Sequence, residues 1–221
     1  LALLTSDIYT VTSNCDYNFL KKSFITKKNI EVRPNWVNKI SYKTIDEREK
    51  NKIISIGRLE DQKNFEYILE ELKDLNLVID IVGKGKNKKV LEDTASKNNV
   101  SINFLGTIKN EELLPLMEKY RFFISASKFE GNPKTILEAL SVGCVVFASN
   151  IPNHQELIND SNGYLFNLSE NSLRNIFQDS NKNLSELKSK SKKGYNYVHS
   201  NNSLLTSVEN EFKDYSLISK T

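Results

Sequence analysis

The sequence predicts an α/β fold: a Rossmann-like, doubly wound parallel sheet followed by C-terminal helices. Short apolar runs alternate with segments of helical spacing between residues 52 and 166, which is the pattern of right-handed βαβ units. The runs are apolar throughout, so both faces of the sheet are expected to be covered by helices. After residue 167 the composition turns to Ser, Asn, Lys and Leu at helical spacing, which predicts helices.

The expected elements follow in order from Lys52. The strands are KIISIG from Lys52, NLVIDIVG from Asn76, SINFLG from Ser101, RFFISAS from Arg121, CVVFAS from Cys144 and the short NGYLFN, which ends near Phe166. The helices are FEYILEELKDL, a Lys-rich segment through Val90 and Leu91, NEELLPLMEKY and the segment that starts near Asn132. NHQELIND begins a sixth βα element. Asn110 and Asn132 are the expected N-caps, and Pro133 suits the first helical turn because its φ is already helical.

Residues 1–50 are expected to be the remnant of another domain with a linker, residues 51–168 a Rossmann-like domain, and residues 169–221 C-terminal helices. SDIYTVTSN and NIEVRPNWV predict short strands, and DYNFLKKSF predicts a helical turn or two. Residues 38–50 are polar and charged, and are expected to form a linker or an exposed turn. The sequence has no initiator Met, so we expect an upstream part to be missing. An apolar stripe on the last helix should pack on the N-terminal segment or stay partly exposed. The stripe consists of Leu204, Val208, Phe212 and Tyr215.

The composition indicates a soluble globular protein. Of the 221 residues, 38% are hydrophobic and 27% charged, and no apolar run approaches the ~20 residues of a membrane span. The net charge is only +3 with Lys and acidic residues interspersed, whereas a nucleic-acid binder concentrates its basic residues. The Lys-rich patches at 84–89 and 188–193 are expected to be solvated helix faces, with weak attraction to an anionic membrane surface as the alternative. Two cysteines are too few for a disulfide framework or a metal site, which favours the cytoplasm, and Cys144 should be buried.

The string KFEGNPKTILEALSVGCVVFASN carries the strongest functional signal. It places Glu130 in a loop and Glu138 on the following helix, eight positions later. A helix start of this kind suits a phosphate, and Glu138 could accept hydrogen bonds from sugar hydroxyls. The alternative is an exposed carboxylate on an amphipathic helix and another in a loop.

The loop after the first strand of the sheet excludes a dinucleotide-binding dehydrogenase. That fold needs G-x-G-x-x-G, so that backbone can touch the pyrophosphate, but this loop offers Gly57 with the cations Arg58 and Lys63. A phosphate would be met by these two side chains and by the helix start at Asn132. The alternative is two surface cations beside a turn.

Several other catalytic patterns are missing from the sequence. It has no D-x-D and no G-x-S-x-G, and GKGK at residues 83–86 is not a Walker P-loop. His154 is expected to be a capping or loop residue in preference to a catalytic one.

Four motifs together resemble the retaining GT-B glycosyltransferases of family GT4. They are GRL…KN at 57–64, FLG at 104–106, E-x7-E with EAL and Gly143, and NG-Y-L-F at 162–166. The resemblance covers roughly residues 5–166. It implies that Arg58 and Lys63 bind the donor's diphosphate and neutralise the leaving group, that Glu130 faces the transferred sugar, and that Glu138 binds the ribose. It also implies further donor contacts, at Gly57, Thr107, Ile108, Gly131, Asn132, Pro133, Lys134 and Thr135, with Thr107 and Ile108 beside the base.

The resemblance implies a retaining, metal-independent transfer from a nucleotide-diphosphate sugar to a saccharide, lipid or protein acceptor, without a cofactor. The biology would be surface polysaccharide or glycoconjugate synthesis, in the cytoplasm or at the inner membrane face. The family's N-terminal acceptor domain is largely absent here, so this chain alone is expected to be inactive. The alternative is a non-catalytic GT-B-like module that acts as a partner subunit. The presence of Arg58, Lys63, Glu130 and Glu138 argues against it.

Overall fold

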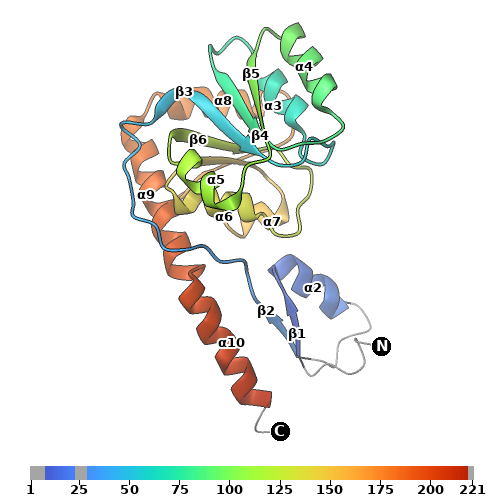
Figure 1. The fold of residues 1–221 in the computed structure, drawn as a ribbon, viewed down its shortest axis with the longest axis vertical. Coiled ribbons are helices and arrows are strands. Elements are labelled where there is room, and N and C mark those ends of the chain that lie inside the picture. The colour runs from blue at the N-terminus through green and yellow to red at the C-terminus, as the bar shows by residue number, and fades with distance from the viewer. Residues whose placement is uncertain (1–7, 23–28, 219–221) are drawn as a thin grey trace.

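The computed structural model describes residues 8–22 and 29–218, and its centre is a six-stranded parallel sheet (Figure 1). The strand order is β5-β4-β3-β6-β7-β8. The strands are β3 (Glu49–Ile56), β4 (Val78–Val82), β5 (Ser101–Gly106), β6 (Tyr120–Ser125), β7 (Val145–Ser149) and β8 (Tyr164–Phe166). The predicted doubly wound sheet is therefore confirmed, and its order reverses between β3 and β6, which is the topological switch point of such sheets.

Helices cover both faces of the sheet. The helices that follow the strands are α3 (Phe65–Glu71), α4 (Lys88–Lys97), α5 (Asn110–Met117), α6 (Lys134–Ser141), α7 (Pro152–Gln155), α8 (Ser172–Asn181) and α9 (Leu184–Asn201). Side chains of α3, α4 and α8 build one buried cluster on the sheet, whereas those of α5 and α6 build a second. The long helix α9 contributes to both clusters.

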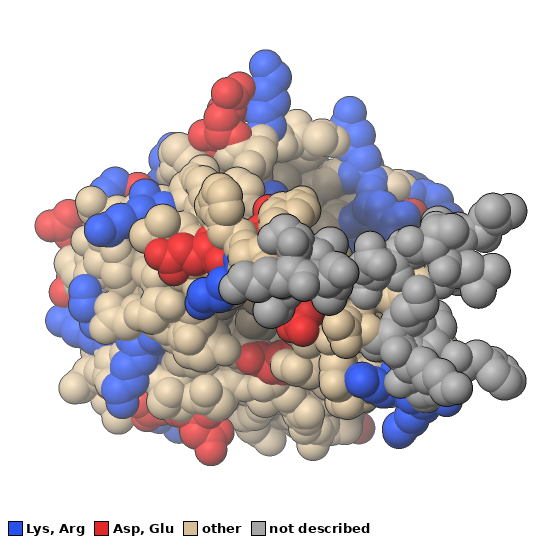
Figure 2. All heavy atoms as spheres, turned by 90° about the horizontal axis from the view of Figure 1, so that it is seen from below, with Lys and Arg blue, Asp and Glu red and all other residues tan. Residues whose placement is uncertain are grey.

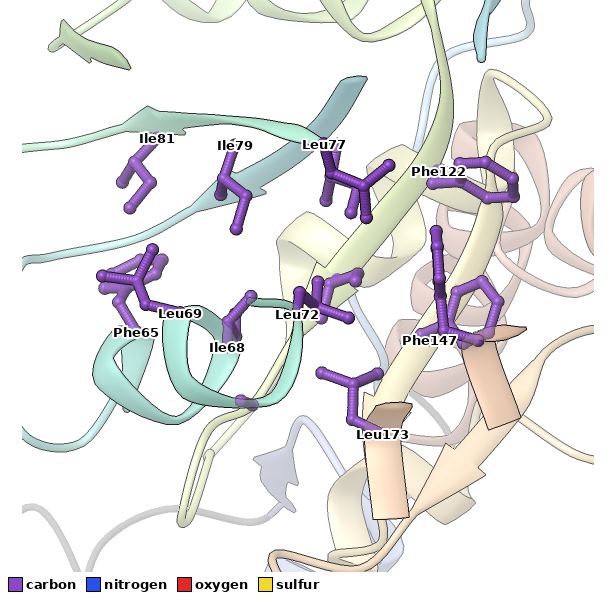
Figure 3. Close-up of a cluster of buried hydrophobic side chains, with 14 of the residues drawn as sticks. Phe65, Ile68, Leu69, Leu72, Leu77, Ile79, Ile81, Phe122, Phe147 and Leu173 are labelled. Carbon is purple, nitrogen blue, oxygen red and sulfur yellow. The ribbon is translucent and has the colours of Figure 1, made fainter. Parts of the chain in front are cut away.

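Neighbouring residues of a strand enter different clusters. Ile53 and Phe122 lie in the first cluster, whereas Ile54 and Phe123 lie in the second, because successive side chains of a strand point to opposite faces. Figure 3 shows the first cluster, where the α3 side chains of Phe65 and Leu69 and their neighbours face the sheet. Each fully buried residue of this kind contributes about 1.5–3 kcal/mol. Burial on both faces explains why the strands are apolar throughout.

The N-terminal and C-terminal elements lie together below the sheet domain in Figure 1. They are β1 (Ile8–Val11), which pairs in parallel with β2 (Asn29–Val32), then α2 (Asn14–Lys22) and the terminal α10 (Leu204–Ile218). The Glu156 carboxylate, just after α7, accepts hydrogen bonds of 2.9 Å from two backbone N–H groups at the start of α2. Arg33, next to β2, donates through Nε to Asp214 of α10 at 3.0 Å. The stripe on α10 stays exposed, as expected, with Phe212 71% and Tyr215 68% exposed.

Three expected boundaries are corrected. β3 begins at Glu49, inside the segment predicted as a linker, because its first residues pair beside β6. Lys109, and not Asn110, is the N-cap of α5. Pro133, and not Asn132, is the N-cap of α6, since the Asn132 side chain donates to the Thr12 carbonyl instead. The predicted strand start at Ser6 and helix end at Phe24 lie outside the described residues.

The charged surface is mixed, as predicted. Figure 2 shows basic and acidic side chains interspersed with neutral ones on the face seen from below. The lysines of the 84–89 patch are exposed, and Lys89 pairs with Asp93 at 2.9 Å. Lys190 contradicts the expectation for the second patch because it is 7% exposed. Its Nζ donates to the Gly163 carbonyl and lies over the Tyr164 ring. Cys144 is fully buried, as predicted, and no helix within residues 8–22 and 29–218 has the length and apolar character to cross a membrane.

The loops after β3 and β4 are joined through their backbones at Gly83. Its φ is +145°, and a Cβ there would lie 1.9 Å from the Gly57 carbonyl oxygen. Around this contact the Leu59 N–H donates to the Lys84 carbonyl, and the Asn87 N–H donates to the Leu59 carbonyl, both at 3.0 Å. The glycines of the GKGK string therefore allow two loops to pack closely.

Gly83→Ala should lower the free energy of unfolding by more than about 1 kcal/mol, because Ala neither fits this contact nor tolerates the positive φ. Urea unfolding followed by circular dichroism would measure the change. Gly131→Ala is the matched control, since a Cβ at Gly131 meets nothing within 4 Å. Equal midpoints for Gly83→Ala and the unmodified chain would show that the two loops adjust freely.

Candidate functional site

An ion pair lies at the switch point of the sheet. Lys63, in the loop after β3, donates to Glu130, in the loop after β6, with Nζ and Oε1 2.5 Å apart. The two side chains are only 17% and 10% exposed. Ligands of open α/β sheets bind in the crevice at this point. The structure therefore brings together two of the three residues predicted to be catalytic.

A polar chain beneath the pair positions the Glu130 carboxylate. The Ser127 hydroxyl donates to Oε1 of Glu130 at 2.6 Å, and the Ser149 hydroxyl donates to the Ser127 carbonyl, also at 2.6 Å. His154 Nδ1 lies 2.8 Å from the Ser149 carbonyl oxygen, and because a carbonyl can only accept, Nδ1 carries the proton. Since Lys63 and Ser127 both contact Oε1 of Glu130, its Oε2 accepts no hydrogen bond from the described residues and could accept one from a ligand.

His154 lies in α7 and is fully buried, so the expectation of a capping or loop residue is wrong. Burial lowers the pKa of His154, and the nearby charge of Glu130 opposes that shift. Its Nε2 has no hydrogen-bond partner among the described residues. His154 therefore supports the site from beneath in its neutral form.

Arg58 stands apart from the ion pair. Its side chain is 69% exposed, and its Nη1 lies 3.4 Å from a carboxylate oxygen of Glu60. Gly57 belongs to the site for a different reason, because a Cβ there would lie 2.9 Å from the side-chain carbons of Lys63. The bare backbone of Gly57 thus gives room to the stem of Lys63.

Glu138 is a buried carboxylate on α6. It is 4% exposed, and its nearest cation is Lys134, with Nζ 3.6 Å from Oε1. Burial raises the pKa of the Glu138 carboxyl, and Lys134 opposes that shift. Glu138 and Lys134 line a cavity of about 240 Å³ together with residues 35–38 and two residues of α5. A buried carboxylate is unfavourable unless its charge is compensated, and Lys134 is the one cation within 4 Å among the described residues, so this arrangement suits a ligand that brings hydroxyl groups.

The remaining predicted donor contacts lie on loops at the same carboxyl edge. Thr107 and Ile108 join β5 to α5, and Ile108 packs against the second core cluster. Gly131 accepts a hydrogen bond of 2.6 Å from the Asn153 amide. Pro133 and Thr135 lie at the start of α6, beside the Asn132 amide that holds Thr12. Their predicted contacts with a donor stay predictions.

Sequence reasoning missed the residues that support the site from other elements. Ser127 precedes Glu130 by three positions, a spacing that could have suggested a local hydrogen bond. Ser149 and His154 carry no such signal. They come close to Ser127 and Glu130 only because β7 pairs with β6 in the folded sheet. Among the described residues, no group of three or more His, Cys, Asp or Glu side chains is placed to hold a metal ion.

Residues 37–192 match the sequence model of a family described as Glycosyl transferases group 1. The chain belongs to this family. The matched segment contains the ion pair and Glu138, so the family assignment and the geometry concern the same part of the molecule.

Two relatives illustrate the family's range. The Streptococcus agalactiae protein named UDP-N-acetylglucosamine–peptide N-acetylglucosaminyltransferase GtfA subunit is 26% identical over 136 residues, which are 58% of this chain and 27% of that protein. The poly(glycerol-phosphate) alpha-glucosyltransferase of Bacillus subtilis is 33% identical over 130 residues, 53% of this chain and 18% of that protein. The chain therefore covers about a quarter or less of the length of these relatives.

Solved structures of the family share the fold. Sucrose-phosphate synthase from Thermosynechococcus elongatus aligns with a TM-score of 0.87 at 19% identity, over 99% of this chain and 60% of that one. The pneumococcal O-GlcNAc transferase GtfA, solved in complex with UDP and GlcNAc, aligns with a TM-score of 0.78 at 18% identity. The alignment covers 97% of this chain and 46% of that one. The expected resemblance to GT-B glycosyltransferases is confirmed, whereas placement in family GT4 stays a prediction.

Glu138→Gln should stabilise the folded chain at about pH 7, because a neutral amide carries no charge into the buried position. Since the folded-state pKa of Glu138 is raised, stability falls as pH rises through that pKa, and a neutral amide avoids this loss. The gain should vanish below about pH 3, where a carboxyl is protonated in both the folded and the unfolded state. Urea unfolding at both pH values would measure it, with the exposed Glu112→Gln on α5 as control. A gain that is independent of pH would contradict the electrostatic explanation.

Proposed function

We propose that this chain is the donor-binding part of a retaining, metal-independent glycosyltransferase that uses a nucleotide-diphosphate sugar. The observation that carries the proposal is the Lys63–Glu130 pair at the switch point, with the buried Glu138 carboxylate on the helix that follows. A nucleotide sugar needs a cation for its diphosphate, a carboxylate for its ribose and a polar group for the transferred sugar. The three residues supply these groups along one edge of the sheet.

Lys63 acts on the diphosphate in this proposal. As the sugar leaves, negative charge develops on the β-phosphate, and an ammonium group held in place lowers the barrier electrostatically. Lys63 is already fixed, because its stem packs against Gly57 and its Nζ contacts Glu130. Arg58 is exposed and would turn from Glu60 towards the phosphates when the donor binds.

Glu130 and Glu138 act on the two sugars. The free oxygen of Glu130 would accept a hydrogen bond from a hydroxyl of the transferred sugar, while Glu138 would accept hydroxyl hydrogen bonds from the ribose. The N-terminus of α6, with Asn132 to Thr135, would meet the phosphates through backbone N–H groups. No residue of this chain is assigned as a general base, and the leaving phosphate would help to deprotonate the acceptor.

The names of the relatives guide the choice of donor and acceptor. One relative is named for UDP-N-acetylglucosamine, and two solved neighbours were crystallised with UDP, so UDP is the first nucleotide to test. Relatives are named for peptide, poly(glycerol-phosphate) and capsular polysaccharide products, which supports an acceptor of the saccharide, lipid or protein classes. The acceptor would be bound largely by a further domain, in the cytoplasm or at the inner membrane face.

A partner subunit is the second candidate role. One relative is named as a subunit, and a solved neighbour is a complex of two such proteins. A non-catalytic module would bind its partner without binding a nucleotide, so nucleotide affinity separates the two roles.

Lys63→Ala should weaken UDP binding by tenfold or more, because a hydrogen bond to a charged group contributes about 1.5–3 kcal/mol. Calorimetric titration of the chain with UDP, GDP and ADP would measure the affinities. Lys52→Ala is the control, since Lys52 lies on β3 away from the carboxyl edge. The absence of binding for all three nucleotides, in this chain and in a longer protein that carries it, would reject the proposed function.

Glu130→Gln should tighten the binding of UDP without a sugar, by roughly threefold to tenfold. The substitution removes a negative charge beside the diphosphate and frees Lys63 from its ion pair. For a UDP-sugar the same variant should show a smaller gain in affinity, or a loss of affinity, because the carboxylate that faces the sugar is missing. Calorimetry with UDP and with a UDP-sugar tests both expectations. An equal loss of affinity for the two ligands would show that Glu130 serves only to hold Lys63.

A further inference from the structure

The cavity around Glu138 is closed on one side by the segment that precedes the sheet. Its lining includes Trp36 and Asn38 from this segment, Asn110 and Leu114 from α5, and Lys134 with Glu138 from α6. A second, more open hollow of about 630 Å³ adjoins it and shares Asn38, Asn110 and Leu114 with it. The cavity at Glu138 and Trp36 therefore continues past Asn38 into a hollow that is open to the surface.

The backbone of this segment is anchored on both sides of Trp36. The Val37 N–H donates to the Asn202 carbonyl at 2.9 Å, and the Asn202 amide donates to the Asn35 carbonyl at 3.0 Å. Val37 itself is 4% exposed and Asn202 5%. Trp36, between these anchors, is 42% exposed. The structure thus holds a large aromatic side chain at the cavity while leaving much of it uncovered.

The chemistry of the lining fits a nucleoside. A carboxylate accepts hydrogen bonds from ribose hydroxyls, and the amides of Asn38 and Asn110 both donate and accept, as the edge of a base requires. Stacking of a base on an aromatic side chain contributes about 1–3 kcal/mol. Asn110 follows Ile108 by two positions, so the loop expected to line the base ends at this cavity.

We propose that Trp36 stacks on the nucleobase of the donor, with the ribose on Glu138 and the base directed towards Asn38 and Asn110. The inference rests on the proposed function and adds a binding residue from outside the predicted Rossmann-like domain. It makes the segment before β3 part of the nucleotide site.

Trp36 is the one tryptophan of the chain, so its fluorescence reports on this cavity directly. UDP should change the emission of Trp36 in a saturable way, and the dissociation constant should agree with the one that calorimetry gives. UDP should also protect Trp36 from quenching by acrylamide. Inorganic pyrophosphate and ribose 5-phosphate lack a base and should do neither at saturation.

Substitutions test the contribution to affinity. Trp36→Ala should weaken UDP binding by tenfold or more, whereas Trp36→Phe should stay within about threefold, because Phe retains an aromatic face. Neither variant should change the affinity for pyrophosphate. Phe212→Ala, which removes an exposed aromatic from α10, is the matched control and should bind UDP like the unmodified chain.

The outcomes separate this inference from the proposed function. If calorimetry detects UDP binding while Trp36 fluorescence and quenching stay unchanged, and Trp36→Ala binds equally well, the inference is overturned and the proposed function stands. If calorimetry detects no nucleotide binding, in this chain and in a longer protein that carries it, the proposed function fails and this inference fails with it. Circular dichroism of each variant would check that the fold is intact.

Discussion

The covered faces of the sheet determine where this molecule can bind a ligand. The residues in the middle of the sheet are buried on both faces, with Ile53 and Ile54 as adjacent examples on opposite sides, so a ligand cannot reach the faces of the sheet there. Because all six strands are parallel, the loops that follow them gather at one edge. The reversal of strand order between β3 and β6 separates the helices there, and Lys63 and Glu130 occupy that gap. The packing that stabilises the fold thus also concentrates charge at one place.

The two carboxylates of the site differ in how closely a cation approaches them. Glu130 has a cation at 2.5 Å and the hydroxyl of Ser127 at 2.6 Å, so its charge is well compensated. Glu138 is more buried, with its side chain 6% exposed against 10% for Glu130, and its nearest cation, Lys134, lies 3.6 Å away. An uncompensated buried charge lowers stability unless a ligand supplies hydrogen bonds. Such local conflicts are typical of binding sites, where part of the stability of the free protein is given up for function.

The sequence predicted what depends on periodicity and missed what depends on long-range contacts. Apolar runs located the six strands, and the spacing of Glu130 and Glu138 pointed to the loop and helix that carry them. The helix starts were misplaced by one residue at Asn110 and Asn132. At Asn132 the side-chain amide bonds to Thr12, 120 positions earlier. Lys190 was expected in solvent, yet the turn carbonyl of Gly163 and the ring of Tyr164 compensate its burial. Contacts of this kind leave no local pattern.

The site is also held by residues from both ends of the chain, across the boundaries predicted at residues 50 and 168. Thr12 accepts from Asn132 at the start of α6, and Asn202, at the end of α9, anchors the segment that carries Trp36. Each such hydrogen bond contributes about 0.5–1.5 kcal/mol, which is small for the fold but large for the placement of a side chain. A piece limited to residues 51–168 would keep Lys63, Glu130 and Glu138, yet lose one wall of the cavity at Glu138. The proposed donor site is therefore better regarded as a property of the sheet together with the segments that flank it.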